Sequence, residues 1–167
     1  MRTRRLALPA PFLLLVLMTA NLSAARDPHV AETAPPDRPQ RVAGEQYRDF
    51  IAACEPYVKK ARESYPAAKA RYLAGLPPKH SFFITARLID DAGRMEQVFV
   101  AVDRIADGVI EGQIWSSVDL VTGYKFRDTI RVPEAEIVDW LITNPDGTEE
   151  GNVVGNFLDH YEPGKAP

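Results

Sequence analysis

Four aspartates are the residues through which this sequence could perform acid–base chemistry. A hydrolase that uses two carboxylates needs them roughly 5 to 9 Å apart, and Asp103, Asp119, Asp128 and Asp139 are the candidates for such a pair. Most of them stand beside turns or at strand ends, where Asp is common because its side chain bonds nearby backbone. The residues therefore predict no catalytic site, and a small hydrolase with paired carboxylates is the alternative interpretation.

Cysteine and serine chemistry is not indicated either. Cys54 is the only thiol in the chain, and a catalytic thiolate would need a histidine beside it. Because Cys54 falls on the apolar face of a predicted helix, we expect a buried, idle thiol. Ser81, Ser116 and Ser117 could each be drawn into a Ser-His-Asp arrangement, but no Gly-x-Ser-x-Gly motif supports one.

Metal ligation has two candidate groups of residues. His29, His80 and His160 stand in different segments, without the paired spacing of a zinc site. One loop gathers side-chain oxygens, but it lacks the Asp-x-Asp/Asn-x-Asp/Asn-Gly order of a calcium-binding hand. The residues of this loop are Asn144, Asp146, Glu149, Glu150 and Asn152. We expect a plain acidic hairpin turn there, with no metal and no cofactor.

Two Gly-Asn repeats and two tryptophans are the candidates for binding. Gly151-Asn152 and Gly155-Asn156 are four residues apart, so on a helix both amides would share one face. They could line a polar pocket, but the favoured interpretation is structural, with glycine supplying positive φ and Asn capping backbone. The tryptophans likewise favour core anchors over ligand stackers. If a binding surface exists, its predicted residues are Trp115, Asp139, Trp140, Asn152 and Asn156.

The elements that must position these residues begin with a helical stretch. Apolar residues recur at steps of three and four between Glu45 and Gly75, which is the spacing of one helical face. Pro56 and Pro66 interrupt the pattern, and proline disrupts a helix beyond its first turn. We therefore predict three short helices, one before Pro56, one over 56–64 and one over 66–74, with Gly75 as a C-cap. Lys59-Lys60 is interpreted as a solvated face of the second helix.

From His80 onward the apolar period changes to two, which is typical of strands. Turns at 90–93 and 107–108 separate three predicted antiparallel strands. The three strands are Ser81–Ile89, Met95–Ile105 and Val109–Trp115. Two shorter strands follow at 118–121 and 129–132, then one turn of helix at 133–136, a hairpin with a strand at 138–143 and a turn at 144–147, and a closing helix at 152–158. A helix over 138–143 is the alternative to that strand. The fold class is α+β, with N-terminal helices packed on a curved antiparallel sheet of about five to seven strands.

The N-terminal region predicts export. Residues 1–25 have a basic start, an apolar stretch over 12–18, and small residues at Ser23 and Ala25 before a predicted cleavage site. The apolar stretch falls short of the roughly 20 residues of a membrane span, and no cysteine stands at the cut for a lipid anchor. The general secretory route is favoured, although Arg4-Arg5 keeps the twin-arginine route open.

Composition and charge define the remaining organisation. Residues 26–43 are proline-rich, with almost no large apolar side chains, and predict an unfolded linker. Residues 44–160 form one predicted domain, and 161–167 a frayed tail. Removing the three arginines of the signal takes the formal charge from −3 to about −6. No run of Lys and Arg stands outside the signal, so nucleic acid is not a predicted partner.

A family resemblance is carried mainly by the last third of the chain. The segment 137–140 (Ile-Val-Asp-Trp) is followed, after a turn, by 151–157 (Gly-Asn-Val-Val-Gly-Asn-Phe). With these motifs, and others from Pro56 onward, most of residues 56–159 resembles the YegJ-type bacterial domain of unknown function. The family often has Gly-Asp where this chain has Arg127-Asp128. The resemblance implies a compact α+β domain, often exported, and it brings no catalytic residue.

Together these observations predict a non-enzymatic binding or interaction module in the periplasm or outside the cell. The expected partner is another protein or a component of the cell envelope, and no membrane span is expected after signal cleavage. Sheet edges and the region of Trp140 and Asn152 form the predicted contact surface. The sequence makes no prediction about oligomeric state.

Overall fold

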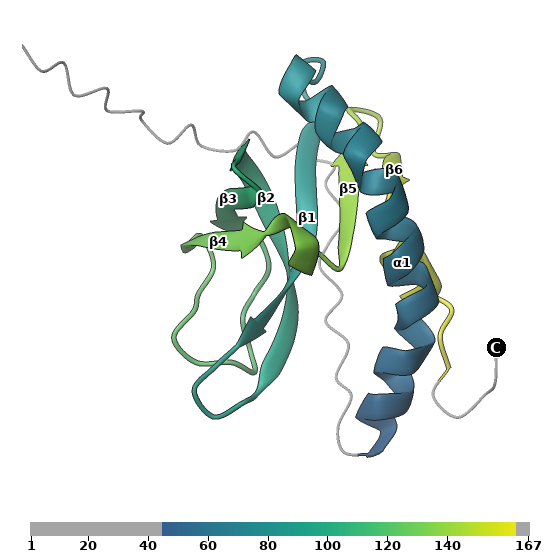
Figure 1. The fold of residues 1–167 in the computed structure, drawn as a ribbon, viewed down its shortest axis with the longest axis vertical. Coiled ribbons are helices and arrows are strands. Elements are labelled where there is room, and N and C mark those ends of the chain that lie inside the picture. Colours follow the sequence, from purple (N-terminus) through teal and green to yellow (C-terminus); the bar gives the residue numbers. More distant parts are fainter. Residues whose placement is uncertain (1–44, 163–167) are drawn as a thin grey trace, which may run out of the picture.

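A single long helix, α1 (Glu45–Ala74), opens the part of the protein that the structure describes. The structure is a computed structural model, and it describes residues 45–162. The predicted signal peptide at 1–25 and the predicted linker at 26–43 lie outside the described residues, as do residues 163–167 of the predicted tail. Figure 1 shows α1 running along one side of the strands.

The prediction of three short helices is wrong, because α1 continues through Pro56 and Pro66 over 30 residues. An interior proline costs a helix about 3 kcal/mol. Burying one apolar side chain contributes roughly 1.5–3 kcal/mol. Helix α1 buries a whole row of residues at steps of three and four, and a break at either proline would divide this row. The row is Phe50, Cys54, Val58, Ala61, Tyr65 and Ala68. Both prolines lie on the exposed side of the helix.

Six antiparallel strands form one open sheet, in the order β4-β3-β2-β1-β5-β6. The strands are β1 (Ser81–Ile89), β2 (Met95–Ala106), β3 (Val109–Ile114), β4 (Thr129–Pro133), β5 (Asp139–Thr143) and β6 (Glu149–Gly151). A 3-10 turn, η1 (Glu134–Glu136), precedes β5, and the short helix α2 (Val153–Leu158) follows β6. The predicted α+β class is confirmed, with one N-terminal helix in place of several.

Most of the predicted strands are confirmed, and two expectations are corrected. The three-strand meander and the hairpin around 144–147 form as expected, so the alternative of a helix over 138–143 is wrong. Residues 118–121 form no strand. The backbone N–H groups of Asp119, Leu120 and Val121 instead donate to the side-chain carboxylate of Glu96 on β2, at 2.9–3.2 Å.

The main core lies between α1 and one face of the sheet. Alternate residues of β1 and β2, such as Ile84 and Val100, meet Ala61 and Tyr65 of α1 there, and Trp140 of β5 belongs to the same cluster. The alternation expected for 138–143 implied one buried face, but all five residues of β5 are buried. A central strand covered on both faces reads as a continuous buried run.

A second buried carboxylate holds the same irregular loop at its far end. Asp90, at the β1–β2 turn, accepts the backbone N–H of Thr122 at 3.0 Å and those of Ala92 and Arg94 at 3.0 and 2.9 Å. The Arg94 guanidinium also contacts this carboxylate, at 2.7 Å. Residues 119–122 are therefore fixed to the β1–β2 hairpin through the side chains of Glu96 and Asp90.

Replacing Glu96 with alanine should destabilise the fold by about 1–3 kcal/mol, because it leaves the N–H groups of residues 119–121 without their acceptor. Urea denaturation of Glu96→Ala measures this loss. Glu136→Ala, at an exposed glutamate of η1, is the matched control and should change the midpoint little. Equal effects of the two variants would show that the Glu96 carboxylate does not hold the loop.

Acid should weaken the contact that Asp90 makes. The backbone N–H of Thr122, and Arg94 beside it, hold the pKa of Asp90 well below its ordinary value. Its ionised form therefore stabilises the folded state above the unfolded pKa of about 3.9, and this stabilisation is lost as the pH falls through the lower, folded pKa. Asp90→Asn should have a lower urea midpoint than the wild type at pH 7, and the gap should narrow as the pH falls below about 4. Asp91→Asn, at the exposed neighbour, should show no such pH-dependent gap.

Candidate functional site

The carboxylate of Asp139 joins strand β5 to helix α2. The side chain is 1% exposed; its Oδ1 accepts the N–H of Trp140 at 2.8 Å, and its Oδ2 accepts the N–H of Val154 at 2.6 Å. Asn152, at the N-cap position of α2, makes no capping bond with its own side chain. Asp139 thus caps α2 from a neighbouring strand. Burial raises the pKa of Asp139, and the bonds from the Trp140 and Val154 N–H groups oppose that rise.

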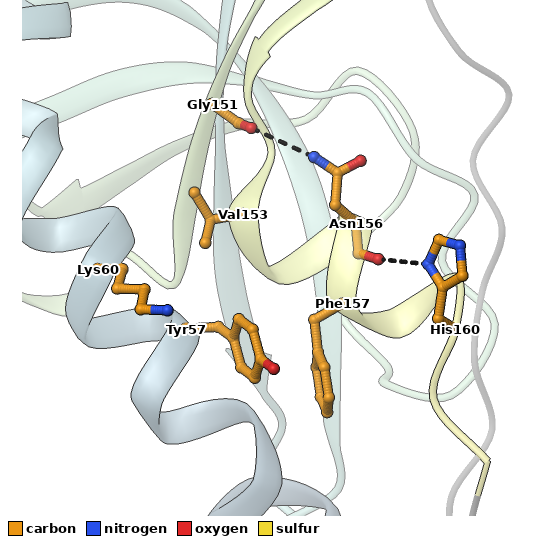
Figure 2. A pocket seen from close by; sticks show the side chains of 7 residues that line it. All are labelled: Tyr57, Lys60, Gly151, Val153, Asn156, Phe157 and His160. Carbon is orange, nitrogen blue, oxygen red and sulfur yellow. Dashed lines mark hydrogen bonds between the residues drawn. The ribbon is translucent and has the colours of Figure 1, made fainter. Parts of the chain in front are cut away.

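Helices α1 and α2 form an open groove of about 570 Å³ between them (Figure 2). This volume lies within the range of roughly 300–1,000 Å³ that is common for ligand sites. The lining residues are Tyr57, Lys60, Gly151, Val153, Asn156, Phe157 and His160. The rings of Tyr57 and Phe157 stack with centroids 4.1 Å apart, and they hold the two helices together at the groove.

Two basic side chains and an amide accompany this aromatic pair. The Nζ of Lys60 lies 5.4 Å from the centroid of the Tyr57 ring, and the Nδ1 of His160 lies 2.9 Å from the carbonyl oxygen of Asn156. A carbonyl only accepts, so Nδ1 donates in this bond, and the Nε2 of the neutral ring is then an acceptor that offers no proton to an anion. The ammonium of Lys60 is therefore the charged donor of the groove. No carboxylate belongs to the groove lining. The arrangement can bind an anionic group beside an apolar one.

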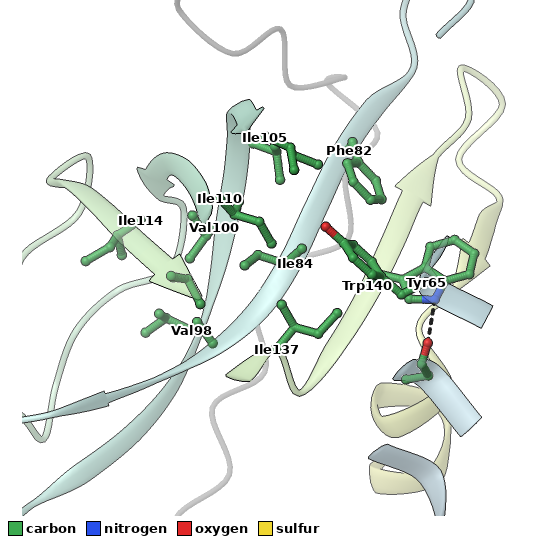
Figure 3. Packing of buried hydrophobic residues seen from close by; sticks show 14 of the residues in the cluster. Tyr65, Phe82, Ile84, Val98, Val100, Ile105, Ile110, Ile114, Ile137 and Trp140 are labelled. Carbon is green, nitrogen blue, oxygen red and sulfur yellow. Dashed lines mark hydrogen bonds between the residues drawn. The ribbon is translucent and has the colours of Figure 1, made fainter. Parts of the chain in front are cut away.

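Trp140 and Asn152 support the groove from beneath instead of lining it. Trp140 lies within the core (Figure 3), and its Nε1 donates to the Ala61 carbonyl at 3.1 Å and the Ser64 hydroxyl at 3.0 Å. A Cβ at Gly151, whose φ is +84°, would lie 2.8 Å from the Trp140 ring. Asn152 donates from Nδ2 to Glu149 at 2.5 Å. Gly151 supplies the positive φ that the structural interpretation predicted, but the expectation that Asn152 caps backbone is wrong, because its side chain bonds the Glu149 carboxylate instead. The core-anchor interpretation of Trp140 is confirmed.

The predicted contact surface is therefore corrected in part. Asp139 and Trp140 are 1% and 8% exposed and engaged in internal hydrogen bonds, so they cannot present a surface to a partner. Asn156 lines the groove. Trp115 lies apart from it, just after β3, where its ring packs against Phe126 at 5.3 Å. The five predicted residues do not form one site.

Several other residues that the sequence offered for catalysis or metal binding are buried or bonded within the fold. Cys54 is fully buried, which confirms the predicted burial, and burial raises the pKa of its thiol to about 11. In the acidic hairpin, Asp146 accepts from Thr148 and Glu150 pairs with Arg71. Ser116 is buried and accepts the N–H of Phe99. Within residues 45–162, no group of three or more His, Cys, Asp or Glu side chains could hold a metal ion.

Sequence reasoning missed four groove residues: Tyr57, Lys60, Phe157 and His160. It assigned Lys60 to a solvated helix face and placed His160 near a frayed end. One available signal was the i, i+3 spacing of Tyr57 and Lys60, together with the i, i+3 spacing of Phe157 and His160, each on one helical side. That α2 packs beside this part of α1 follows only from the tertiary structure.

Comparisons with known proteins add no further identification. No family model, curated protein or solved structure matches this chain. The resemblance to the YegJ-type domain therefore stays a prediction. Among the described residues, neither helix is both long and apolar enough to span a membrane. The fold and groove define the class directly: an open α+β domain with a two-helix groove on one side of its sheet.

Removing the capping carboxylate should loosen α2. Asp139→Ala leaves the buried N–H groups of Trp140 and Val154 unsatisfied, at a cost of about 1–3 kcal/mol. It should also disturb the Tyr57–Phe157 stack. Urea denaturation and near-ultraviolet circular dichroism measure the two effects, with Asp49→Asn on the exposed side of α1 as the control. An unchanged aromatic spectrum in Asp139→Ala would show that α2 does not need this cap.

Proposed function

We propose that this protein is an exported, non-enzymatic binding module. Its groove between α1 and α2 takes a short peptide segment of a partner protein in which a carboxylate side chain stands next to an aromatic or large apolar one. The export proposal rests on the signal-like pattern of residues 1–25, and the resemblance to YegJ-type domains agrees with it. The binding proposal rests on the groove.

One observation carries the binding proposal: the groove combines an aromatic floor with Lys60 and His160 and has no acidic lining residue. The positive charge of Lys60 in this lining contrasts with the formal charge of −3 of the whole chain. A carboxylate on the ligand complements the Lys60 ammonium, and an adjoining ring can lie against Tyr57 and Phe157. The open form of the groove suits a segment of extended chain more than an enclosed small molecule.

The hydrolase alternative has less support. It requires two convergent carboxylates in a cleft, and the lining of the groove contains none. Of its candidates, Asp139 caps α2, and Asp128 accepts the N–H of Lys125 at 2.9 Å. Carboxylates with such bonds act as structural acceptors. We therefore retain the binding module as the proposed function.

A charge reversal in the groove tests the proposal. A fluorescein-labelled peptide, Ala-Glu-Phe-Ala, should bind the mature chain in a fluorescence anisotropy titration. Lys60→Glu should weaken this binding about tenfold, which corresponds to about 1.4 kcal/mol. Lys59→Glu is the matched control, because Lys59 is its exposed neighbour on α1 and does not line the groove. It should bind nearly as the wild type does.

A second peptide separates charge from ring contact. Ala-Gln-Phe-Ala, which lacks the carboxylate, should bind the wild type more weakly than Ala-Glu-Phe-Ala does. Its affinity for Lys60→Glu should be about the same as its affinity for the wild type. Equal binding of both peptides to the wild type, or equal losses in Lys59→Glu and Lys60→Glu, would contradict recognition of a carboxylate in the groove. Binding of neither peptide would contradict the proposed ligand class.

A further inference from the structure

Strand β4 forms one edge of the sheet, and every second residue of it directs its backbone groups away from the sheet (Figure 1). Its register with β3 is continuous, and at the end of the pairing the Glu134 N–H donates to the Gly108 carbonyl at 2.9 Å. Hydrogen-bonded pairs alternate along an antiparallel ladder, so the even-numbered residues of β4 bond to β3 and the odd-numbered ones do not. The N–H and carbonyl groups of Thr129 and Arg131 therefore point outward.

This edge is open within the described part of the chain. Among residues 45–162, no strand, loop or side chain bonds to the outward backbone groups of Thr129 and Arg131. The side chains of both residues are exposed. An open edge of this kind is a site at which an extended chain can add as a further strand. Pro133 has no N–H to offer, so the pairing would end there.

Arg127 stands just before β4 in a backbone conformation that arginine rarely adopts. Its φ is +71°, which glycine adopts freely and a residue with a Cβ adopts only at a cost. Its guanidinium carbon, Cζ, lies 5.3 Å from the centroid of the Trp115 ring and 5.9 Å from that of the Phe126 ring. These ring contacts hold the guanidinium in place and leave its N–H donors for another group. The strained backbone thus presents a fixed cation at the start of the open edge.

The side chains along this edge carry an excess of positive charge. Arg127 and Arg131 are exposed, and neither guanidinium forms a hydrogen bond or ion pair with a residue of the described chain. Glu111 of β3 stands opposite Arg131 in the register, but Arg104 of β2 stands on the other side of Glu111. Opposite charges on facing strands attract. A strand that adds to β4 would therefore be favoured if it carried acidic side chains opposite the two arginines.

We infer that the edge of β4 binds an extended acidic segment of a partner protein, which adds antiparallel to β4 with carboxylates opposite Arg127 and Arg131. A second copy of this chain fits less well, because pairing two β4 strands about Arg131 would place two guanidinium groups side by side. A lipid or a glycan lacks the regular alternation of N–H and carbonyl groups that matches the edge. The inference is independent of the groove, which lies between α1 and α2.

A labelled peptide tests this edge in the full mature chain. Fluorescein-labelled Ser-Val-Glu-Val-Thr-Val-Glu-Ser has glutamates four residues apart, as Arg127 and Arg131 are, and it should bind in an anisotropy titration. Arg131→Glu should weaken this binding at least tenfold. Arg48→Glu, the same charge change at an exposed arginine of α1, is the matched control and should bind as the wild type does. Lys60→Glu should also bind normally, which separates this edge from the groove.

Backbone pairing has its own signature, measured with the wild-type protein. In the proposed strand the N–H groups of the two glutamates point toward β4, and those of the valines point away. N-methylation of both glutamates should therefore weaken binding more than tenfold, whereas N-methylation of two valines should change it little. Equal losses from the two modified peptides would overturn the addition of a strand.

Arg127→Gly separates recognition from folding. Glycine adopts the positive φ freely while the ring contacts are lost, so the urea midpoint should stay near that of the wild type. Peptide binding should nevertheless weaken several-fold. Unchanged affinity in both Arg127→Gly and Arg131→Glu would overturn the role of the arginines. A peptide that does not bind the wild-type chain would overturn the edge as a site for acidic segments.

Discussion

The buried carboxylate of Asp139 is the interaction on which the candidate site depends. Helix α2 has only six residues, and isolated helices below roughly 12–15 residues are marginal in water. It is held by the Asp139 bond to the Val154 N–H and by the packing of Val154 with Val138 and α1. Without that cap, Phe157 would lose its fixed position beside Tyr57. A residue that could have served chemistry therefore serves as the anchor of one groove wall.

Acidic side chains perform this role elsewhere in the fold. Glu96 accepts the N–H groups of residues 119–121, and Asp90 accepts those of Thr122, Ala92 and Arg94. In each case the carboxylate replaces the strand partner or helical turn that irregular backbone lacks. Charge-assisted bonds of this kind are stronger than neutral ones. The acidic composition of the domain therefore stabilises loops and a helix end, and it places no carboxylate in the groove lining.

The continuity of α1 connects the core to the groove. Val58 and Ala61 of this helix are buried, while Tyr57 and Lys60, the residue before each of them, reach the groove. A helix broken at Pro56 would detach Tyr57 from the buried row that fixes it. Local propensity predicted that break, and it was outweighed because tertiary burial of the whole row exceeds the local cost of a proline. The three-strand meander was predictable because its turns and its period of two are local signals.

The sequence by itself determined the α+β class, the strand order from Ser81 to Ile114, the hairpin at 144–147, and the apolar row of α1 that contains Cys54. These follow from periodicity and turn chemistry, which act over a few residues. Only the tertiary structure decided that Asp139 and Trp140 turn inward, that Glu96 replaces an expected strand pairing, and that Lys60 and His160 flank one groove. Each of those outcomes joins residues far apart in the chain. The physical reason is that hydrogen-bond satisfaction and burial are settled between elements, and no local pattern records which elements meet.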